Sequence, residues 1–389
     1  MITLLAGDCR DVLATLPAQS VQTIVTSPPY YGLRKYTDDP REIGQEPTPA
    51  AYVAALVAVF ADCWRVLRDD GTLWLNLGDS YASKPGGPQG ANGQRATRTF
   101  TSTDRGGIGD RPEKNLLGMP WRVALALQDA GWILRSDIIW AKPNPMPESV
   151  RDRPTRAHEY LFLFAKRQRY FYDATAIVEP ISASTIARWG DRATDRTNAY
   201  SSAPDRNDYK PPSGEQSLGS RPDGTRNRRS VWTIATQPYA GAHFATMPEA
   251  LIAPCILAGS SAQACETCGK AWGRVVDVTR LGLDELPHDH PEYRKTNVPR
   301  NRGNGDRNDE NDMRRVPFHT DRGFAPRCAC PANTGTARSI VLDPFGGTGT
   351  VARVAERHQR DSMLIDLNPA YIDLQEERTN GVQVEMQLC

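Results

Sequence analysis

Residues Ser27 to Tyr30 form a short stretch, Ser-Pro-Pro-Tyr, that combines a hydroxyl, two prolines and an aromatic ring. It follows the β-branched run Val21–Thr26, which predicts a strand. Proline cannot donate to a sheet ladder and it biases the residue before it towards extended geometry, so the strand must end here. The stretch is therefore predicted to be a stiff loop at the carboxyl end of a strand, where open parallel sheets bind ligands.

A second stretch with the composition of a binding loop lies near the end of the chain, in SIVLDPFGGTGTVARVAERHQRDSMLIDLNPA. Strand Ile340–Leu342 leads into a turn in which Gly347 and Gly349 lack the Cβ that would hold a ligand away from the backbone. Strand Met363–Ile365 ends at Asp366, a position from which a carboxylate can accept hydrogen bonds from ribose hydroxyls. The spacing also fits the loose dinucleotide fingerprint G-x-G-x-x-G/A, so these residues predict a nucleotide-type ligand and leave the cofactor open.

Four of the eight cysteines fall in two close pairs, which are Cys265 with Cys268 and Cys328 with Cys330. A C-x-x-C pair followed by a second close pair is typical of a four-thiolate zinc site, which is structural because four thiolates leave no open position on the metal. The alternatives are buried thiols without a metal, or His288 and His290 as substitute ligands. The other cysteines show no pairing pattern and are predicted to be packing or terminal residues: Cys9, Cys63, Cys255 and Cys389.

Alternating strands and helices must position these loops. The predicted strands are Ile2–Ala6, Val21–Thr26, Gly71–Tyr81, Ile133–Trp140, Tyr160–Ala165, Ile340–Leu342 and Met363–Ile365. The predicted helices are Arg10–Leu16, Ala50–Leu67 with Thr48 as its N-cap, Trp121–Asp129 and Thr350–Arg357. This alternation is typical of an α/β fold with a mainly parallel sheet.

Three polar blocks interrupt the pattern, at about 83–112, 182–230 and 281–327, and are predicted to be mobile surface loops. Two of them carry an arginine-rich end, which suits a polyanionic partner although the net charge of the chain is only +1. No stretch approaches the roughly 18 apolar residues of a membrane span, and the N-terminus lacks a signal-peptide pattern. A cytoplasmic protein without a membrane partner is therefore predicted.

Together, VTSPPY near the N-terminus and DPFGGTGT near the C-terminus resemble the amino-methyltransferases of DNA, which methylate an exocyclic amino group of adenine or cytosine from S-adenosyl-L-methionine. The order of the two loops is similar to the circularly permuted beta group of that family. The resemblance extends through GTLWLNLGDSY, IIWAKPNPMPESVRDRPTRAHEYLFLFAKRQRYFYD and HFATMPEALI. It implies a doubly wound, mainly parallel seven-stranded sheet. It also implies that the strands carrying Asp8 and Asp366 are neighbours, because permutation requires the chain ends to be close.

The resemblance also implies the site residues. Asp8 would face the adenine of the cofactor and Asp366 its ribose, with the methionine end inside the glycine-rich loop, although Asp8 could instead be a helix N-cap. The implied cofactor-binding set is Asp8, Asp343, Phe345, Gly347, Gly349, Asp366 and Asn368. The implied catalytic set is Ser27, Pro28, Pro29 and Tyr30. In it, the Ser27 oxygen and the Pro28 carbonyl accept the hydrogens of the target amino group, and Tyr30 stacks on a base flipped out of the duplex.

Double-stranded DNA is the implied partner, and a cognate restriction endonuclease would be a second. Phosphate contacts are predicted for the cations of one proline-stiffened loop, Lys142, Arg151, Arg153 and Arg156. Target recognition is predicted in the segment 183–230, through Arg226, Arg228 and Arg229. The earlier polar block at 83–112 is the rival location for it.

Serine at position 27 is similar to the cytosine-N4 enzymes of the family, whereas aspartate or asparagine is commoner in adenine-N6 enzymes. Cytosine is therefore the predicted target and adenine the alternative. Further alternatives are a methyltransferase acting on RNA or a protein amide, and a catalytically inactive zinc-containing DNA-binding protein. The implied domains are a catalytic half at 1–182, the recognition segment, a cofactor-binding half at 231–264 and 331–389, and at 265–330 a zinc-binding insertion with a mobile loop, similar to a module in some phage and bacterial DNA methylases.

Overall fold

The computed structural model describes residues 1–82, 112–180, 225–237, 246–281, 316–331, 333–379 and 382–383. The chain forms two compact units. Unit 1 consists of Met1–Ala176, Arg229–Gly273 and Pro326–Cys389, and unit 2 consists of Ile177–Arg228 and Arg274–Ala325. Both ends of the chain thus belong to unit 1, as do the two cysteine pairs. The predicted polar blocks lie largely outside the described residues.

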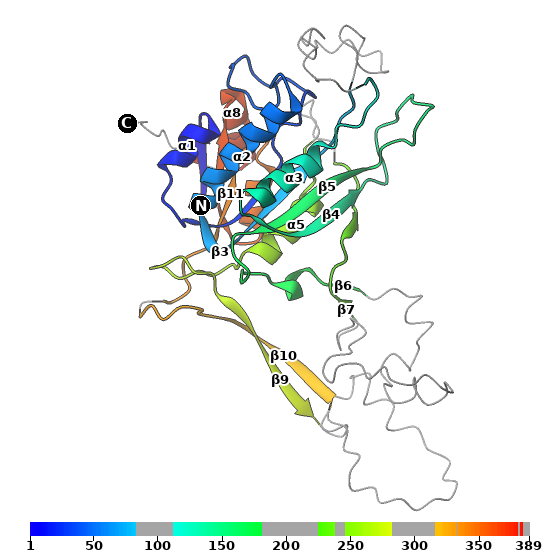
Figure 1. Cartoon of the computed structure of the whole chain (residues 1–389). Helices are drawn as coiled ribbons and strands as arrows, with labels where there is room; N and C mark the ends of the chain where they lie inside the picture. The colour runs from blue at the N-terminus through cyan, green and yellow to red at the C-terminus, as the bar shows by residue number, and fades with distance from the viewer. Residues whose placement is uncertain are drawn as a thin grey trace, which may run out of the picture. The chain divides into compact units, whose positions relative to one another are not determined.

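Unit 1 is built on one sheet (Figure 1). Its strands are β1 (Ile2–Ala6), β2 (Val21–Thr26), β3 (Leu67–Leu77), β4 (Ile133–Ala141), β5 (His158–Ala165), β8 (Val231–Thr233), β11 (Ile340–Asp343), β12 (Asp361–Asp366) and β13 (Val382–Gln383). Their order is β13-β1-β12-β11-β2-β3-β5-β4-β8. The strands β1, β12, β11, β2 and β3 are parallel, and β5 is antiparallel to both β3 and β4. The predicted mainly parallel sheet of seven strands is confirmed, and the short strands β13 and β8 extend it at its edges.

Helices cover both faces of this sheet, as in a doubly wound fold. They are α1 (Cys9–Thr15), α2 (Pro49–Val66), α3 (Met119–Asp129), α5 (Glu249–Gly259), α7 (Thr350–Arg357) and α8 (Pro369–Arg378). Helices α1, α2 and α3 lie along one side of the sheet and α5 along the other (Figure 1). Every residue of β2 is buried, which is the pattern of a parallel strand covered on both faces.

Strand β1 near the N-terminus and strand β12 near the C-terminus are neighbours in the sheet, as the permuted order predicts. They pair in parallel from Ile2 with Ser362 to Ala6 with Asp366. The Gly7 N–H continues the ladder to the Asp366 carbonyl at 2.9 Å. The first and last strands of the predicted core are therefore adjacent.

The start of β3 differs from the prediction. Gly71 was predicted to end the helix and begin the strand, but α2 ends at Val66 and β3 begins at Leu67 without an intervening loop. Gly71 instead lies where the register between β2 and β3 shifts, and a Cβ there would lie 2.5 Å from Leu67 Cδ1. A glycine inside a strand that marks a bulge looks in the sequence like a helix terminator. The remaining predicted elements are found within two residues of their predicted ends.

Helix α2 also corrects the statement that no segment is long and apolar enough to span a membrane. By length and composition α2 meets that criterion, with a mean hydropathy of 1.4 over 18 residues. Its apolar side is buried in the core of unit 1, where Tyr52, Leu56 and Phe60 pack among residues of the sheet and of α3. Length and composition alone do not separate a core helix from a membrane-spanning one, and the packing of α2 identifies it as part of the core.

Within the described residues, unit 2 contains two small sheets of two strands each. The strands β9 (Gly273–Leu281) and β10 (Val316–Ala325) pair with each other, and β6 (Glu179–Pro180) pairs with β7 (Thr225–Arg226). Ion pairs link β9 to β10, between Arg274 and Asp321 and between Arg322 and Asp277. The charges on this ribbon are thus largely paired with one another.

Candidate functional site

The two predicted loops face one cavity of about 940 Å³ in unit 1. Strands β2 and β11 are parallel neighbours, so the loops that follow them emerge side by side at the same edge of the sheet. Ser27, Pro28, Pro29 and Tyr30 line the cavity from the first loop, and the segment 343–348 lines it from the second. Its volume is within the range of small-molecule and cofactor sites.

A buried hydrogen bond joins the ends of these two strands. Thr26 Oγ1 donates to Asp343 Oδ1 at 2.6 Å, and the Phe345 N–H donates to the same oxygen at 3.1 Å. Burial raises the pKa of the Asp343 carboxyl to about 7, and the nearby charge of Asp366 acts in the same direction. The hydrogen bonds from Thr26 and Phe345 favour the ionised form and only partly offset this rise. The bond fixes the start of each loop relative to the other.

The glycine-rich loop is shaped by backbone geometry that only glycine adopts easily. Gly347 has φ +50° and Gly349 has φ +75°, both in the left-handed region. The Gly347 N–H donates to Asp366 Oδ2 at 2.7 Å, and the Asn368 N–H donates to Asp366 Oδ1 at 2.9 Å. Burial raises the pKa of Asp366 to about 7 as well, against the effect of these two donors. The carboxylate thus closes the loop and lines the cavity together with Asn368.

Asp8 combines both roles that the sequence left open. Its side chain caps α1 by accepting from the Arg10 N–H at 2.9 Å, and it also lines the cavity. Burial opposes ionisation of this carboxyl, but the hydrogen bonds and charge of Arg10, with the charge of Arg41, outweigh it and lower its pKa. Asp8 is therefore a fixed negative charge on the cavity wall.

Tyr30 is held by partners that the sequence analysis did not identify. Its hydroxyl oxygen lies 2.7 Å from Glu159 Oε2 and 3.0 Å from Asn76 Oδ1, and Ser27 Oγ donates to it at 3.3 Å. The ring packs so closely on the backbone of Gly78 that a Cβ there would lie 2.5 Å from Tyr30 Cε2. Asn76 and Glu159 stand on β3 and β5, and the antiparallel pairing of these strands brings them together. Two motifs of the sequence, LNLGD and AHEY, contained these residues without indicating their partner.

A second group of missed residues lines the cavity from the segment after the first loop. Glu42 is buried and accepts from the Tyr36 N–H at 2.7 Å and the Thr37 N–H at 2.8 Å. Burial raises its pKa. Asn368 donates to the Tyr36 carbonyl at 3.0 Å, so this segment packs on the start of α8. Nothing in its local sequence pattern indicated a site.

The four cations predicted to contact phosphates do not form one cluster. Lys142 and Arg156 line the cavity, where Lys142 pairs with Glu159 and Arg156 lies 3.6 Å from Asp79. Arg153 instead pairs with Glu148 at 2.6 Å and lies over the ring of Tyr81, and Arg151 is exposed. Among the three predicted recognition arginines, Arg226 pairs with Glu179 at 2.8 Å within unit 2, Arg228 is half-buried and Arg229 is exposed.

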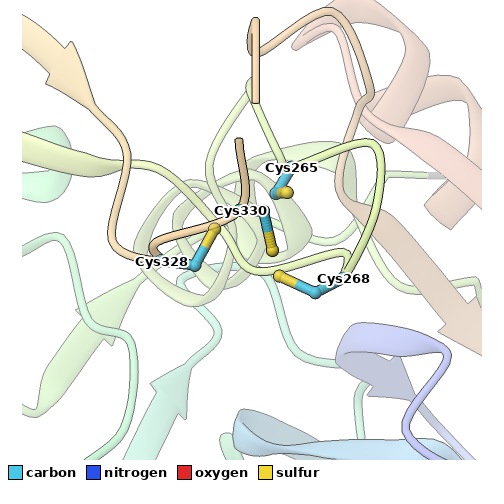
Figure 2. A group of neighbouring side chains, drawn as sticks. All are labelled: Cys265, Cys268, Cys328 and Cys330. Atoms are coloured by element: carbon cyan, nitrogen blue, oxygen red, sulfur yellow. The ribbon is translucent and has the colours of Figure 1, made fainter. Parts of the chain in front are cut away.

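The two cysteine pairs come together, as Figure 2 shows. The four sulfur atoms of Cys265, Cys268, Cys328 and Cys330 all lie within 4.8 Å of one another. Gly269, at φ +67°, lets its N–H turn back to the Cys265 carbonyl at 2.8 Å, which forms a tight turn after the first pair. The Cys268 N–H lowers the pKa of the Cys265 thiol to about 7. The arrangement is a compact group of four thiols, one of them buried.

This cluster is attached to the end of the sheet opposite the cavity. The Gln22 side chain on β2 donates to the Gly269 carbonyl at 2.6 Å and accepts from the Ile340 N–H at 2.5 Å. Arg68 donates to the Cys268 carbonyl. The cysteine turn is thereby tied to β2 and β3, and the same Gln22 side chain joins β2 to β11.

The family model and the relatives that match this chain are all DNA methylases or Type II methyltransferases. The model of the N6/N4 family of DNA methylases matches residues 21–264 and 333–377. The Type II methyltransferase M.XycI of Xanthomonas campestris pv. cyanopsidis is 36% identical over 379 residues, which are 97% of this chain and 88% of the relative. M.Cfr9I of Citrobacter freundii, also a Type II methyltransferase, is 36% identical over 382 residues with the same shares.

Among solved structures, the PvuII DNA methyltransferase (cytosine-N4-specific) matches with a TM-score of 0.51 and 14% identity, over 97% of this chain and 86% of that one. At this identity the likeness concerns the fold alone. The residues 265–332, which contain the cysteine pairs and the β9–β10 ribbon, lie between the two stretches that the family model matches.

Proposed function

This chain belongs to the N6/N4 family of DNA methylases, and we propose that it transfers a methyl group from S-adenosyl-L-methionine to the N4 amino group of a cytosine flipped out of double-stranded DNA. One observation carries the proposal. The Ser27–Tyr30 loop and the segment 343–348 line the same cavity, and the Thr26–Asp343 bond ties the strands that bear them. A donor of a methyl group and its acceptor can therefore meet between the two loops.

The residues of the cavity fit S-adenosyl-L-methionine. Asp8, Asp343 and Asp366 bring carboxylates to its wall, and burial makes the charges of the last two costly when no cation is near. A ligand that carries a sulfonium and an ammonium group would relieve this cost at Asp343, and ribose hydroxyls would supply further donors to Asp366. Asp8, Asp366 and Asn368 would hold the adenosine end, and Asp343, Phe345, Gly347 and Gly349 the methionine end. When bound, the cofactor supplies an electrophilic methyl group.

The first loop would prepare the target base. An exocyclic amino group is a poor nucleophile because its lone pair is delocalised into the ring. Ser27 Oγ and the Pro28 carbonyl accept its hydrogens, which draws the nitrogen towards tetrahedral geometry and frees the lone pair. Pro28 and Pro29 bring no N–H that would compete for these acceptors, and Tyr52 Oη fixes the loop by donating to the Pro29 carbonyl at 2.9 Å. Tyr30 presents a ring for stacking on the flipped base.

The preference for cytosine rests on serine at position 27, as in the resemblance to cytosine-N4 enzymes, and adenine-N6 methylation is the second candidate. Lys142 and Arg156, the two loop cations that line the cavity, would contact the phosphates beside the flipped nucleotide. We assign recognition of the target sequence to the segment 183–230. Cellular DNA as substrate places the reaction in the cytoplasm, and a cognate restriction endonuclease would recognise the same sequence.

We further infer that the four cysteines bind one structural Zn²⁺. Four sulfurs within 4.8 Å of one another match the thiolate set of closed zinc sites. A metal there would be structural, because the hydrogen bonds of Gln22 and Arg68 link the cysteine turn to strands β2 and β3.

Methylation of unmethylated genomic DNA by the purified protein tests the proposal. With methyl-labelled S-adenosyl-L-methionine, mass spectrometry of the digested DNA should show N4-methylcytosine. N6-methyladenine would select the second candidate, and a folded protein that transfers no methyl group to DNA would favour the inactive DNA-binding alternative or another substrate. S-adenosyl-L-methionine should raise the melting temperature and NAD should not. The variants Ser27→Ala and Tyr30→Ala should lose methyl transfer yet keep this thermal shift, because both residues act on the base.

A further inference from the structure

The hydroxyl of Tyr30 has three oxygen neighbours and only one proton to share among them. Glu159 Oε2 is nearest at 2.7 Å, Asn76 Oδ1 lies at 3.0 Å and Ser27 Oγ at 3.3 Å. Which oxygen receives the proton decides how the Ser27 hydroxyl can orient. This matters because Ser27 is useful to a target amino group only as an acceptor.

The neighbours of Tyr30 other than Ser27 can only accept. The amide nitrogen of Asn76 donates to the Tyr160 carbonyl at 3.0 Å, so its oxygen is the atom that faces Tyr30. Glu159 is paired with Lys142, which lies 4.3 Å from the centre of the Trp140 ring. Oε1 of Glu159 accepts from the Lys142 ammonium group, and a carboxylate in such an ion pair offers only acceptors, so Oε2 accepts as well.

The hydrogen bonds therefore run in one direction, from Ser27 to Tyr30 and from Tyr30 to Glu159. Tyr30 donates its single proton towards Glu159, because a hydrogen bond to a charged acceptor is the stronger one. The Tyr30 oxygen is then left as an acceptor, and Ser27 donates to it. Once its proton is committed in this way, the Ser27 oxygen offers only lone pairs to the cavity.

We propose that Glu159 is a positioning residue which sets this direction, so that the Ser27 oxygen accepts a hydrogen from the amino group that becomes methylated. The inference rests on the proposed function of the Ser27–Tyr30 loop. Glu159 itself does not need to touch the substrate. It acts through the Tyr30 hydroxyl.

Replacing Glu159 by glutamine should reverse the direction. Lysine has only donors, so the amide oxygen of Glu159→Gln must face Lys142 and its NH₂ group must face Tyr30. The Tyr30 oxygen then accepts a hydrogen bond from the amide at position 159, so the tyrosine proton must point to another acceptor. The Ser27 hydroxyl then competes with that amide to donate to the Tyr30 oxygen. A charged hydrogen bond is worth about 1.5–3 kcal/mol, so we expect kcat for DNA methylation to fall roughly tenfold to a hundredfold. The KM for S-adenosyl-L-methionine should not change.

A double-mutant cycle with Tyr30→Phe tests the route of the effect. Without the tyrosine hydroxyl, Glu159→Gln should cause no further loss of kcat. Glu356→Gln, which neutralises an exposed carboxylate on α7, is the matched control and should leave kcat unchanged. A full loss from Glu159→Gln in the Tyr30→Phe background would overturn the proposal, as would a raised KM for the cofactor with unchanged kcat.

Thermal unfolding of the same variants separates this inference from the proposed function. If the wild-type protein transfers no methyl group, the proposed function fails, but melting temperatures still report on the hydrogen bond between Tyr30 and Glu159. Glu159→Gln should then lower the melting temperature of the wild type more than that of Tyr30→Phe. Equal shifts in the two backgrounds would show that Glu159 and Tyr30 are not coupled, and would overturn the proposal.

Discussion

Replacing Asp343 by asparagine should make the protein more stable at neutral and alkaline pH. Asp343 is 2% exposed, and its Oδ1 accepts from Thr26 and from the Phe345 N–H. Asparagine has nearly the same shape and keeps an oxygen for both donors. It removes the buried negative charge and puts a neutral NH₂ group in place of the second oxygen, and the cost of burying that group does not depend on pH.

The sign of the pH dependence follows from the raised pKa. The carboxyl has a pKa of about 7 in the folded protein against an ordinary value of 3.8, so between these values the folded state binds the proton more tightly than the unfolded state does. The contribution of Asp343 to stability is therefore full below pH 3.8 and is lost as the pH rises to about 7. From pH 5 to pH 7 the loss is about 2 kcal/mol, because the slope of about 1.4 kcal/mol per pH unit falls off as the pH reaches the folded pKa.

Urea unfolding at pH 5, 6, 7 and 8, followed by tryptophan fluorescence, measures this difference. The gain in unfolding free energy from Asp343→Asn should grow by about 2 kcal/mol between pH 5 and pH 7 and then level off. Asp373→Asn, which neutralises an exposed carboxylate on α8, should show no such growth. Some pH dependence will persist in Asp343→Asn because the pKa of Asp366 is raised in the same direction. If Asp343→Asn and wild type give parallel curves, the charge of Asp343 is not costly in the folded protein and the reasoning fails.

Three further outcomes are expected. Gly78→Ala should reduce methyl transfer without abolishing the thermal shift by S-adenosyl-L-methionine, because the added Cβ displaces the Tyr30 ring; unchanged turnover would contradict the close packing. Elemental analysis should find one zinc per chain, and Cys265→Ser should lower both the metal content and the melting temperature; a protein that retains both would exclude the site. Exchange of residues 182–230 for the matching segment of a relative with another target should change the methylated sequence, and an unchanged sequence would move recognition to residues 83–112.

The elements of the site could be predicted because their signals are local. Pro28 ends β2 in any context, and Gly347 and Gly349 mark a turn whatever surrounds them. The partners of Tyr30 could not be predicted in this way. Glu159 is more than a hundred residues away in the chain and meets Tyr30 only through the antiparallel pairing of β3 with β5. Register between distant strands is a property of the packed sheet.

The loop cations illustrate the same limit for charged side chains. The local sequence placed Lys142 and Arg153 in one basic loop. In the folded chain Lys142 lines the cavity beside Glu159, whereas Arg153 is not among the lining residues and pairs with Glu148, which is. A long charged side chain pairs with whichever opposite charge the folded backbone brings within its reach. Composition therefore predicts how many cations a loop carries better than it predicts where each of them points.

The pairing of β2 with β11 explains why loops separated by more than 300 residues line one cavity. Thr23 pairs with Val341 and Ile24 with Leu342, and this register brings Thr26 within 2.6 Å of Asp343. A slip by one residue would turn the side chain of Thr26 to the other face of the sheet and leave Asp343 without this donor. β2 is buried throughout and β11 nearly so, so a slip would also force closely packed side chains into places shaped for others, and the core therefore fixes the register. The distance between the Ser27–Tyr30 loop and the glycine-rich loop is thus set by the packing of the sheet.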